Sequence, residues 1–328
     1  MSSFLVSGQE ITGTVLDSRT KAPLSGASVY FNNTTLGTIT NEKGEFSLEY
    51  PSSLKTQLVV SFLGYQSFYK DDFSNTADLL FLLKESYNTL DEVVLSPLDD
   101  WSRELKLSEF KKHYLGESEA GKNCQILNEE DISITYNSEN KTLTARSNVP
   151  VVIQNNFLGY FINVDLKKFE AKYSSVSKNK KRLSIHSVTY IGSNQYKSIN
   201  TEPEEKLFTK RATSYLGSTL HFMRALVERQ LNEEGFEIFL EKGNKSYKQW
   251  IKTTSAKGED GVVVSFPKKY NIRYRGTRQS TIECLDESFY IDGFGNHYPP
   301  DRVIFTGDFG NQRMGDALPL DYFLQRLE

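Results

Sequence analysis

Cysteine is scarce in this sequence. Its 328 residues include two cysteines, Cys124 and Cys284. Two cysteines are too few for a disulfide framework, and they show no C-x-x-C spacing of the kind that binds zinc or carries redox chemistry. One disulfide or two buried thiols would both fit, because a free cysteine behaves as a small apolar side chain. Cysteine usage therefore does not decide the cellular compartment.

Long apolar runs and concentrated charge are also missing. The longest unbroken apolar run, LLFLL at 79–83, is far shorter than the roughly 20 residues of a membrane-spanning helix, so we expect no transmembrane segment. The net charge is −3 with no long basic stripe, which argues against nucleic acid as a partner. The dense basic cluster KNKKR at 178–182 is interpreted as a solvated loop rather than an anion site.

The known catalytic motifs are absent as well. The four histidines, His113, His186, His221 and His297, show neither H-x-x-E nor H-E-x-x-H spacing, so we expect no zinc peptidase and no metal site. No G-x-S-x-G elbow, phosphate-binding loop or dinucleotide fingerprint occurs, and no cofactor is predicted. Ser218 lies three residues before His221, where a helix cap is favoured over a Ser–His couple.

The composition that is present favours a β-rich globular protein. Apolar residues make up 38% of the chain and charged residues 25%, with 18 Tyr and 21 Phe. At about 150 residues per domain, the length predicts two domains that can each bury a core.

The first residues suggest an exported protein. SSFLVSGQ at 2–9 has the small-residue end of a secretory signal that lacks its basic and longer apolar parts. We interpret 1–9 as a remnant of such a signal, Met1 as a late start, and the mature protein as beginning near Gln9 or Glu10. The expected location is the periplasm, the outer membrane or the cell surface.

Short alternating strands separated by turns fill 10–85, without a helical period between them. This spacing predicts a small antiparallel β-sandwich. In TNEKGEFSLEY at 40–50, Asn41 and Gly44 suit a tight turn, and Phe46 and Leu48 then alternate with polar residues. Asn41 and Glu42 could instead bind a cation, but the spacing differs from a calcium loop, so the turn is preferred.

The same stretch resembles a known family. Its matches, in order, are G-x-V-x-D, P-L-x-G-A-x-V, G-T-x-T-N-x-x-G-x-F and S-x-L-G-Y, within about 75 residues. This pattern resembles the carboxypeptidase regulatory-like domain, a transthyretin-like sandwich of seven strands. The resemblance implies a non-catalytic module of the kind found beside peptidases, glycan-processing enzymes and outer-membrane transporters.

The segment that follows, TLDEVVLSP at 89–97, is similar to one in TonB-dependent transporters. The roughly 230 residues that remain are too few for a transporter barrel. We therefore interpret 86–97 as a linker, and an adaptor of a TonB-dependent transport system stays an alternative.

Residues 98–328 are predicted to form one α+β domain with an antiparallel sheet and a few helices. Helical spacing at 99–116 ends at Gly116, a hairpin turns at 137–140, and a second helix is expected over 218–235, closed by Gly235. Glu202, Glu204 and Glu205 around Pro203 are interpreted as a solvated loop. The stretches FKKHYLGES, NCQILN, GSTLHFMRAL and GDALPLDY also resemble uncharacterised bacterial envelope proteins, in which a regulatory-like sandwich precedes a domain of unknown function. The expected fold is thus mostly β with two domains.

Loops near the carboxyl end gather the best candidates for a ligand surface. Glycines and prolines there alternate with hydrogen-bonding side chains, which suits a binding loop, although the prolines could merely end a strand. The candidate residues are Asn296, His297, Tyr298, Asp301, Arg302, Asp308 and Arg313. The leading hypothesis is a non-catalytic binding or scaffolding protein of the bacterial cell envelope, whose partner is an envelope protein or a surface glycan. The alternative is an unfamiliar hydrolase that uses His297 with Asp301 or Asp308 in the 292–316 loops.

Overall fold

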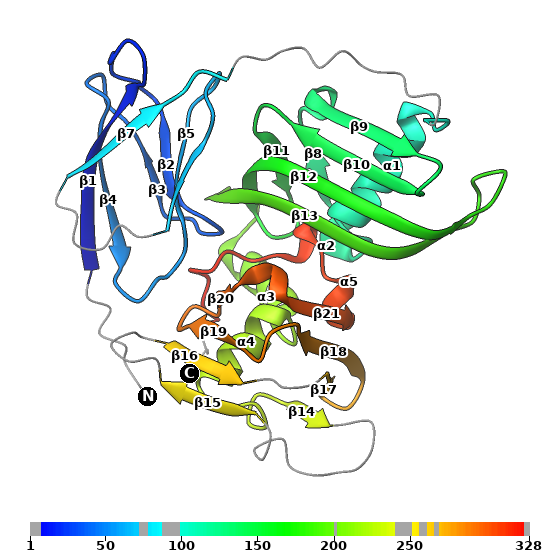
Figure 1. Ribbon diagram of the computed structural model, residues 1–328. Coiled ribbons are helices and arrows are strands. Elements are labelled where there is room, and N and C mark those ends of the chain that lie inside the picture. Colours follow the sequence, from blue (N-terminus) through cyan, green and yellow to red (C-terminus); the bar gives the residue numbers. More distant parts are fainter. Residues whose placement is uncertain are drawn as a thin grey trace.

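The structure is a computed structural model that describes residues 8–71, 78–86, 99–199, 202–239, 251–255, 261–265 and 269–324. The fold is mostly β, as expected, and the buried apolar residues form three clusters, one in each of three units (Figure 1). Residues 1–7 of the signal remnant predicted at 1–9, and residues 87–97 of the linker predicted at 86–97, lie outside the described residues.

The amino-terminal unit is the expected seven-strand sandwich. One sheet has the order β4-β1-β7 and the other β3-β2-β5-β6. All pairs are antiparallel except β1 with β7, which is parallel because the chain crosses from the second sheet to the first before β7. The strands are β1 (Gly8–Asp17), β2 (Ser28–Phe31), β3 (Gly37–Ile39), β4 (Glu45–Pro51), β5 (Leu58–Ser61), β6 (Phe68–Lys70) and β7 (Leu79–Leu83).

The turn at 41–44 is structural. The Asn41 Oδ1 accepts hydrogen bonds from the backbone N–H of Lys43 and Glu45, and Gly44 has φ +76°. Phe46 and Leu48 then point into the core of the sandwich. No cation site is needed to explain these residues.

The middle unit is a six-stranded antiparallel sheet covered by a helix. A long hairpin of β12 (Tyr160–Val176) and β13 (Leu183–Ser198) spans it, and α1 packs on β9, β10 and β12. The KNKKR cluster forms the exposed hairpin turn, as expected. The other elements are α1 (Arg103–Tyr114), α2 (Glu119–Lys122), β8 (Cys124–Ile126), a 3-10 turn η1 (Glu129–Asp131), β9 (Ile132–Asn137), β10 (Thr142–Ser147) and β11 (Val151–Asn155).

The third unit stacks helices against two four-stranded sheets. The sheet orders are β14-β17-β18-β21 and β15-β16-β19-β20. Its elements are α3 (Glu204–Tyr215), α4 (Thr219–Val227), β14 (Phe236–Phe239), β15 (Lys252–Ser255), β16 (Gly261–Ser265), β17 (Tyr270–Tyr274), β18 (Arg278–Cys284), β19 (Ser288–Asp292), β20 (His297–Tyr298), η3 (Pro300–Arg302), β21 (Val303–Gly307), α5 (Asp308–Asn311) and η4 (Met314–Asp316). The single α+β domain expected over 98–328 thus contains two apolar clusters, although Met314 belongs to the cluster of the middle unit.

Two expectations about helices are wrong. Ser218 caps α4, but the helix ends at Val227 because Arg229 takes φ +60°, so it never reaches Gly235. Glu204 and Glu205 are not in a loop. They form the first turn of α3, where acidic side chains favour the positive end of the helix dipole.

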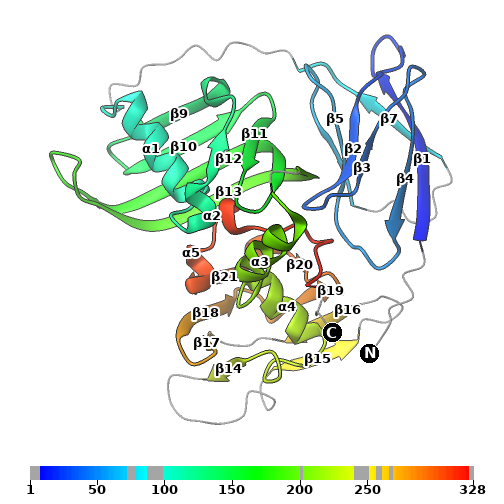
Figure 2. The same ribbon diagram turned by 180° about the vertical axis from the view of Figure 1, so that it is seen from behind.

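The sandwich is docked onto the other units. Its 32–35 loop lies against the end of β13, where the Asn33 N–H donates to the Asn194 carbonyl at 2.8 Å and the Tyr196 N–H donates to the Thr34 carbonyl at 2.9 Å. The Leu320 N–H also donates to the Asn33 carbonyl at 2.7 Å. Figures 1 and 2 show the sandwich beside both the green sheet and the red carboxyl-terminal segment. The sandwich is therefore part of one assembly.

Candidate functional site

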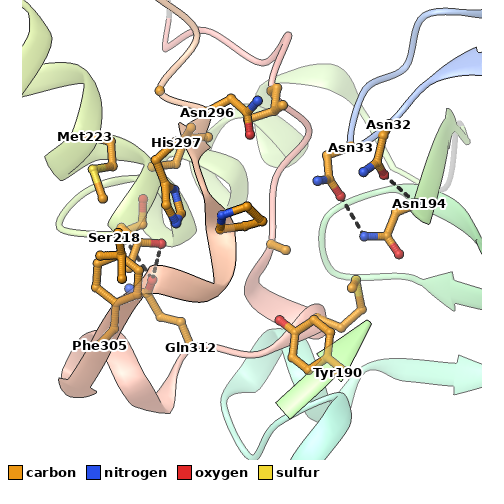
Figure 3. Close-up of a pocket in the computed structure, with 18 of the residues that line it drawn as sticks. Asn32, Asn33, Tyr190, Asn194, Ser218, Met223, Asn296, His297, Phe305 and Gln312 are labelled. Atoms are coloured by element: carbon orange, nitrogen blue, oxygen red, sulfur yellow. Dashed lines mark hydrogen bonds between the residues drawn. The ribbon is translucent and has the colours of Figure 1, made fainter. Parts of the chain in front are cut away.

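A large cleft lies where the three units meet. Its volume is about 1900 Å³, well above the 300–1,000 Å³ of ordinary small-molecule pockets. The sandwich contributes residues from its 32–33 and 52–57 loops, the middle unit contributes β13, and the third unit contributes α4, β20 and β21. Figure 3 shows side chains from all three units turned toward this space.

Three asparagines make one wall. The Asn194 N–H donates to Asn32 Oδ1 at 2.9 Å, and Asn194 Nδ2 donates to Asn33 Oδ1 at 2.6 Å (Figure 3). These bonds fix each side chain and leave Asn32 Nδ2, Asn33 Nδ2 and Asn194 Oδ1 without a protein partner among the described residues. The wall therefore presents both donors and an acceptor in a set geometry.

His297 lies on the wall across from the asparagines (Figure 3). Its ring packs edge-on against Phe305, with centroids 5.7 Å apart, and against Phe289 at 6.4 Å. Burial lowers the pKa of His297 to about 4, although a hydrogen bond to the Pro300 backbone acts in the opposite direction. The imidazole is therefore neutral at pH 7 and adds a polar but uncharged group to the cleft.

Five of the seven predicted ligand residues line the cleft. These are Asn296, His297, Tyr298, Asp301 and Arg313. Asn296 Nδ2 donates to the Lys55 carbonyl at 2.7 Å, so this side chain joins the third unit to the sandwich. Tyr298 is 64% exposed at the rim.

The other two predicted residues do not line it. Arg302 pairs with Asp286 in an exposed ion pair, 2.8 Å from Nη2 to Oδ1, and Asp308 lies in the first turn of α5. Among the described residues, neither Asp301 nor Asp308 forms a hydrogen bond or ion pair with His297. The geometry does not bring together the carboxylate and imidazole of the hydrolase alternative.

Ser218 and His221 do not form a nucleophile and its base. The Ser218 Oγ accepts a hydrogen bond from the His221 backbone N–H at 3.0 Å, as a helix cap does. In the ring, Nδ1 accepts from the Gly217 N–H at 3.0 Å, and Nε2 lies 3.1 Å from a Glu234 oxygen. Both ring nitrogens are thus engaged, and neither can take a proton from Ser218 in this arrangement.

Sequence reasoning missed the groups that hold the cleft in shape. Asp292 is fully buried, and its carboxylate accepts hydrogen bonds from the N–H groups of Phe294, Asn296 and Lys55 at 2.9, 2.9 and 3.1 Å. Burial is the main cause that raises its pKa to about 6. Arg224, 5% exposed, donates to the carbonyls of Phe294, Leu320 and Tyr322 at 3.0, 2.8 and 2.6 Å.

No local signal identifies these residues. Arg224 lies within an apolar helical stripe. Asp292 begins the DGFGN sequence, where an aspartate is ordinarily interpreted as a turn-forming residue. Their partners lie far away in the sequence, so only the fold connects them.

The cysteines, the metal-binding residue types and the helices bear in turn on disulfide formation, metal binding and membrane crossing. Both cysteines are free thiols, which removes the disulfide alternative, and burial raises the pKa of Cys124 to about 12. Within the described residues, no group of three or more His, Cys, Asp or Glu side chains could hold a metal ion. No described helix has the length and apolar character needed to cross a membrane.

Comparison with known proteins identifies one part of the chain. The three-unit, β-rich architecture begins with a seven-strand sandwich. Residues 11–95, which cover all but the first three residues of that sandwich, match the CarboxypepD_reg-like domain family. The amino-terminal unit is therefore a CarboxypepD_reg-like domain. No curated protein matches the chain.

Two solved structures show weak similarity. One is a type II cohesin–X-dockerin complex from Acetivibrio cellulolyticus, 19% identical over 23% of this chain and 56% of that chain, with a TM-score of 0.19. The other is a 9R-lipoxygenase from Cyanothece PCC8801, 13% identical over 63% of this chain and 44% of that chain, also with a TM-score of 0.19. The chain thus spans about half the length of these two solved chains, and neither similarity bears on function.

Proposed function

We propose that this protein is a non-catalytic binding protein of the bacterial cell envelope, and that its ligand lies in the cleft between the three units. The observation that carries the proposal is the cleft itself. Its walls come from every unit, and its asparagine wall holds unpaired donors and an acceptor in place before any ligand arrives. Groups fixed in advance lose little entropy on binding, which favours affinity.

The polar groups of the cleft support binding rather than catalysis. General acid–base chemistry needs an acid or base within hydrogen-bond reach of a positioned partner. His297 has aromatic neighbours and a backbone partner in place of a carboxylate. The side chains of the cleft are thus arranged as contacts for a ligand.

The lining favours an uncharged ligand larger than an ordinary metabolite. Charged lining residues are few and of both signs, and the other side chains are amides, hydroxyls, aromatic rings and aliphatic groups. The charged residues are Lys55, Asp71, Asp301, Arg313 and Asp316. A ligand of high charge would find no complementary field here.

The sandwich would serve as a fixed wall of the site. The resemblance to the carboxypeptidase regulatory-like family implies a non-catalytic module, and this sandwich supplies Asn32 and Asn33 to the cleft. Export to the periplasm, outer membrane or cell surface is part of the proposal and rests on the sequence at 2–9. Fractionation of native cells with amino-terminal sequencing tests it, and recovery only from the cytosol with Met1 intact would contradict it.

A thermal-shift screen tests the binding proposal. Neutral oligosaccharides and uncharged peptides would be added to the purified chain, and a true ligand raises the Tm by mass action. We expect the shift to shrink in Tyr298→Ala, which trims the rim, and to persist in Leu285→Ala, a residue that is 47% exposed and outside the cleft lining. Hydrolysis of model esters, glycosides or peptides that His297→Ala abolishes would overturn the non-catalytic function.

A further inference from the structure

One edge of the long hairpin is open. β13 pairs with β12 along one side, and among the described residues no strand pairs with its other side between residues 183 and 194. Eight consecutive residues of this stretch, 185–192, line the cleft. Successive side chains of a strand point to opposite faces, so a cleft over one face would be lined by alternate residues only. A cleft lined by consecutive residues therefore runs along the backbone edge of the strand.

The open edge carries neither charged residues nor prolines. Natural proteins guard exposed strand edges with lysines, other charges, prolines, β-bulges or a covering segment, and β13 has one irregularity of register, at His186. The stretch LSIHSVTYIGSNQY, 183–196, contains no Lys, Arg, Asp, Glu or Pro. It also exposes large apolar side chains: Ile185 at 39%, Tyr190 at 41% and Ile191 at 58%. An edge of this kind is suited to be covered by another strand.

The end of the same edge already carries strand-like pairing. The sandwich contacts it through the bridge of Thr34 with Gln195, and through outward bonds of Asn194 and Tyr196. Backbone groups of a strand point alternately to its two sides, so Gly192, Tyr190 and Val188 should also point outward. The free edge thus continues an interface that is already in use.

The opposite side of the cleft is also a strand edge. β21 is the last strand of its sheet, and all five of its residues, Val303 to Gly307, line the cleft. Figures 1 and 2 show β21 and α5 next to the lower side of β13 in both views. An extended chain that pairs with β13 would therefore lie within reach of the side chains of β21.

We propose that the cleft binds an extended, uncharged polypeptide strand of a partner protein, which adds to the open edge of β13. This inference rests on the proposed function and names its ligand class. The backbone of the partner would pair with the outward groups of Val188, Tyr190 and Gly192. Its alternate side chains would contact Ile191 on β13 and Ile304, 40% exposed, on β21.

A peptide with blocked backbone donors tests strand addition. Random peptides of about ten residues, which span the free edge at about 3.3 Å per residue, would be selected on the full chain by phage display. The best binder would be synthesised with N-methyl groups at alternate residues, in each of two registers. Strand addition predicts a loss of about 100-fold in affinity for one register and about threefold or less for the other, since only one side of the peptide donates to β13.

A variant locates the binding. Ile191→Lys places a guarding charge at the edge and should weaken the peptide at least about tenfold. Leu127→Lys is the matched control, because Leu127 is 46% exposed in the same unit but outside the cleft lining, and it should leave affinity unchanged. Circular dichroism would check that both variants fold.

The outcomes separate this inference from the proposed function. Strand addition is overturned if the two N-methylated peptides bind with equal affinity. It is also overturned if Ile191→Lys leaves the affinity of the unmethylated peptide unchanged. Failure to select any peptide also overturns it. If a neutral oligosaccharide then raises the Tm and Tyr298→Ala removes that shift, the cleft remains a binding site for another ligand class. If neither class binds, both proposals fail.

Discussion

Two buried charged residues hold the third unit against the sandwich and the carboxyl-terminal segment. Asp292 accepts a hydrogen bond from the Lys55 N–H of the sandwich, and Arg224 donates to three carbonyls of the third unit and the carboxyl-terminal segment. The guanidinium of Arg224 also lies over the Phe323 ring at 4.3 Å. Asn41 and Gly44 were predictable because their turn chemistry is local. Asp292 and Arg224 were not, since their roles depend on distant backbone groups.

The raised pKa of Asp292 predicts a pH-dependent stability. Asp292 has a folded pKa of about 6, above the ordinary 3.8, because its buried site favours the neutral carboxyl. This preference stabilises the fold fully below pH 4, and the stabilisation is lost as the pH rises through 6. The loss is at most about 3 kcal/mol in the free energy of unfolding. Asp292→Asn should flatten this slope in urea titrations between pH 4 and pH 7.

The control for this experiment is Asp286→Asn. Asp286 is exposed, and its ion pair with Arg302 lowers its pKa, so it titrates below this pH range. In Asp286→Asn, the free energy of unfolding should depend on pH as it does in the unmodified chain. A slope that Asp286→Asn removes and Asp292→Asn leaves intact would contradict the assignment.

Arg224→Met should destabilise the protein strongly. The change leaves three carbonyls without their charged donor, which we expect to lower the free energy of unfolding by about 3–5 kcal/mol. Arg273→Met serves for comparison, because Arg273 pairs with Glu237 at the surface and should cost about 1 kcal/mol or less. Equal losses of Tm in the two variants would show that Arg224 does not hold the junction.

Most strands and one helix could be predicted at the scale of elements, because their patterns are local. Phe110 and Tyr114 fall on the buried face of α1, and the β9–β10 hairpin turns where expected. α3 escaped prediction because Pro203 and two glutamates look like a solvated loop, although Pro203 precedes the first helical turn. The elbow between α3 and α4 depends on Gly217, whose role is visible only once Arg278 is in place.

Gly217→Ala should destabilise this elbow. Gly217 has φ +73°, and an added Cβ would lie 1.6 Å from Arg278 Nη2. Gly276 also has φ +73°, but nothing lies within 4 Å of its added Cβ. We expect Gly276→Ala to cost about 1 kcal/mol for backbone strain and Gly217→Ala to cost at least about 2 kcal/mol more. Equal shifts in thermal unfolding would show that Arg278 moves aside without cost.

At the scale of the molecule, the sequence predicted the sandwich but not how it docks. The family pattern lies within one stretch, and the comparison with the CarboxypepD_reg-like family confirms it. The cleft depends on contacts such as Asn33 with Asn194, 161 residues apart, and Lys55 with Asp292, 237 residues apart. No local pattern encodes such pairs. The candidate surface at 296–313 was therefore only part of the site, and its opposite wall appeared with the fold.

The proposed function requires the sandwich to be a fixed wall of the ligand-binding cleft. Spin labels at Leu63→Cys in the sandwich and Leu127→Cys in the middle unit would test it, since these residues are 70% and 46% exposed. Cys124 and Cys284 would be replaced by serine, and a pair within the sandwich, Leu63→Cys with Leu80→Cys, gives the width expected of a rigid body. Double electron–electron resonance should give a single narrow distance distribution between the units, as narrow as that control. A broad or double distribution would mean that the sandwich moves freely, and the cleft would then not be a standing feature of the protein.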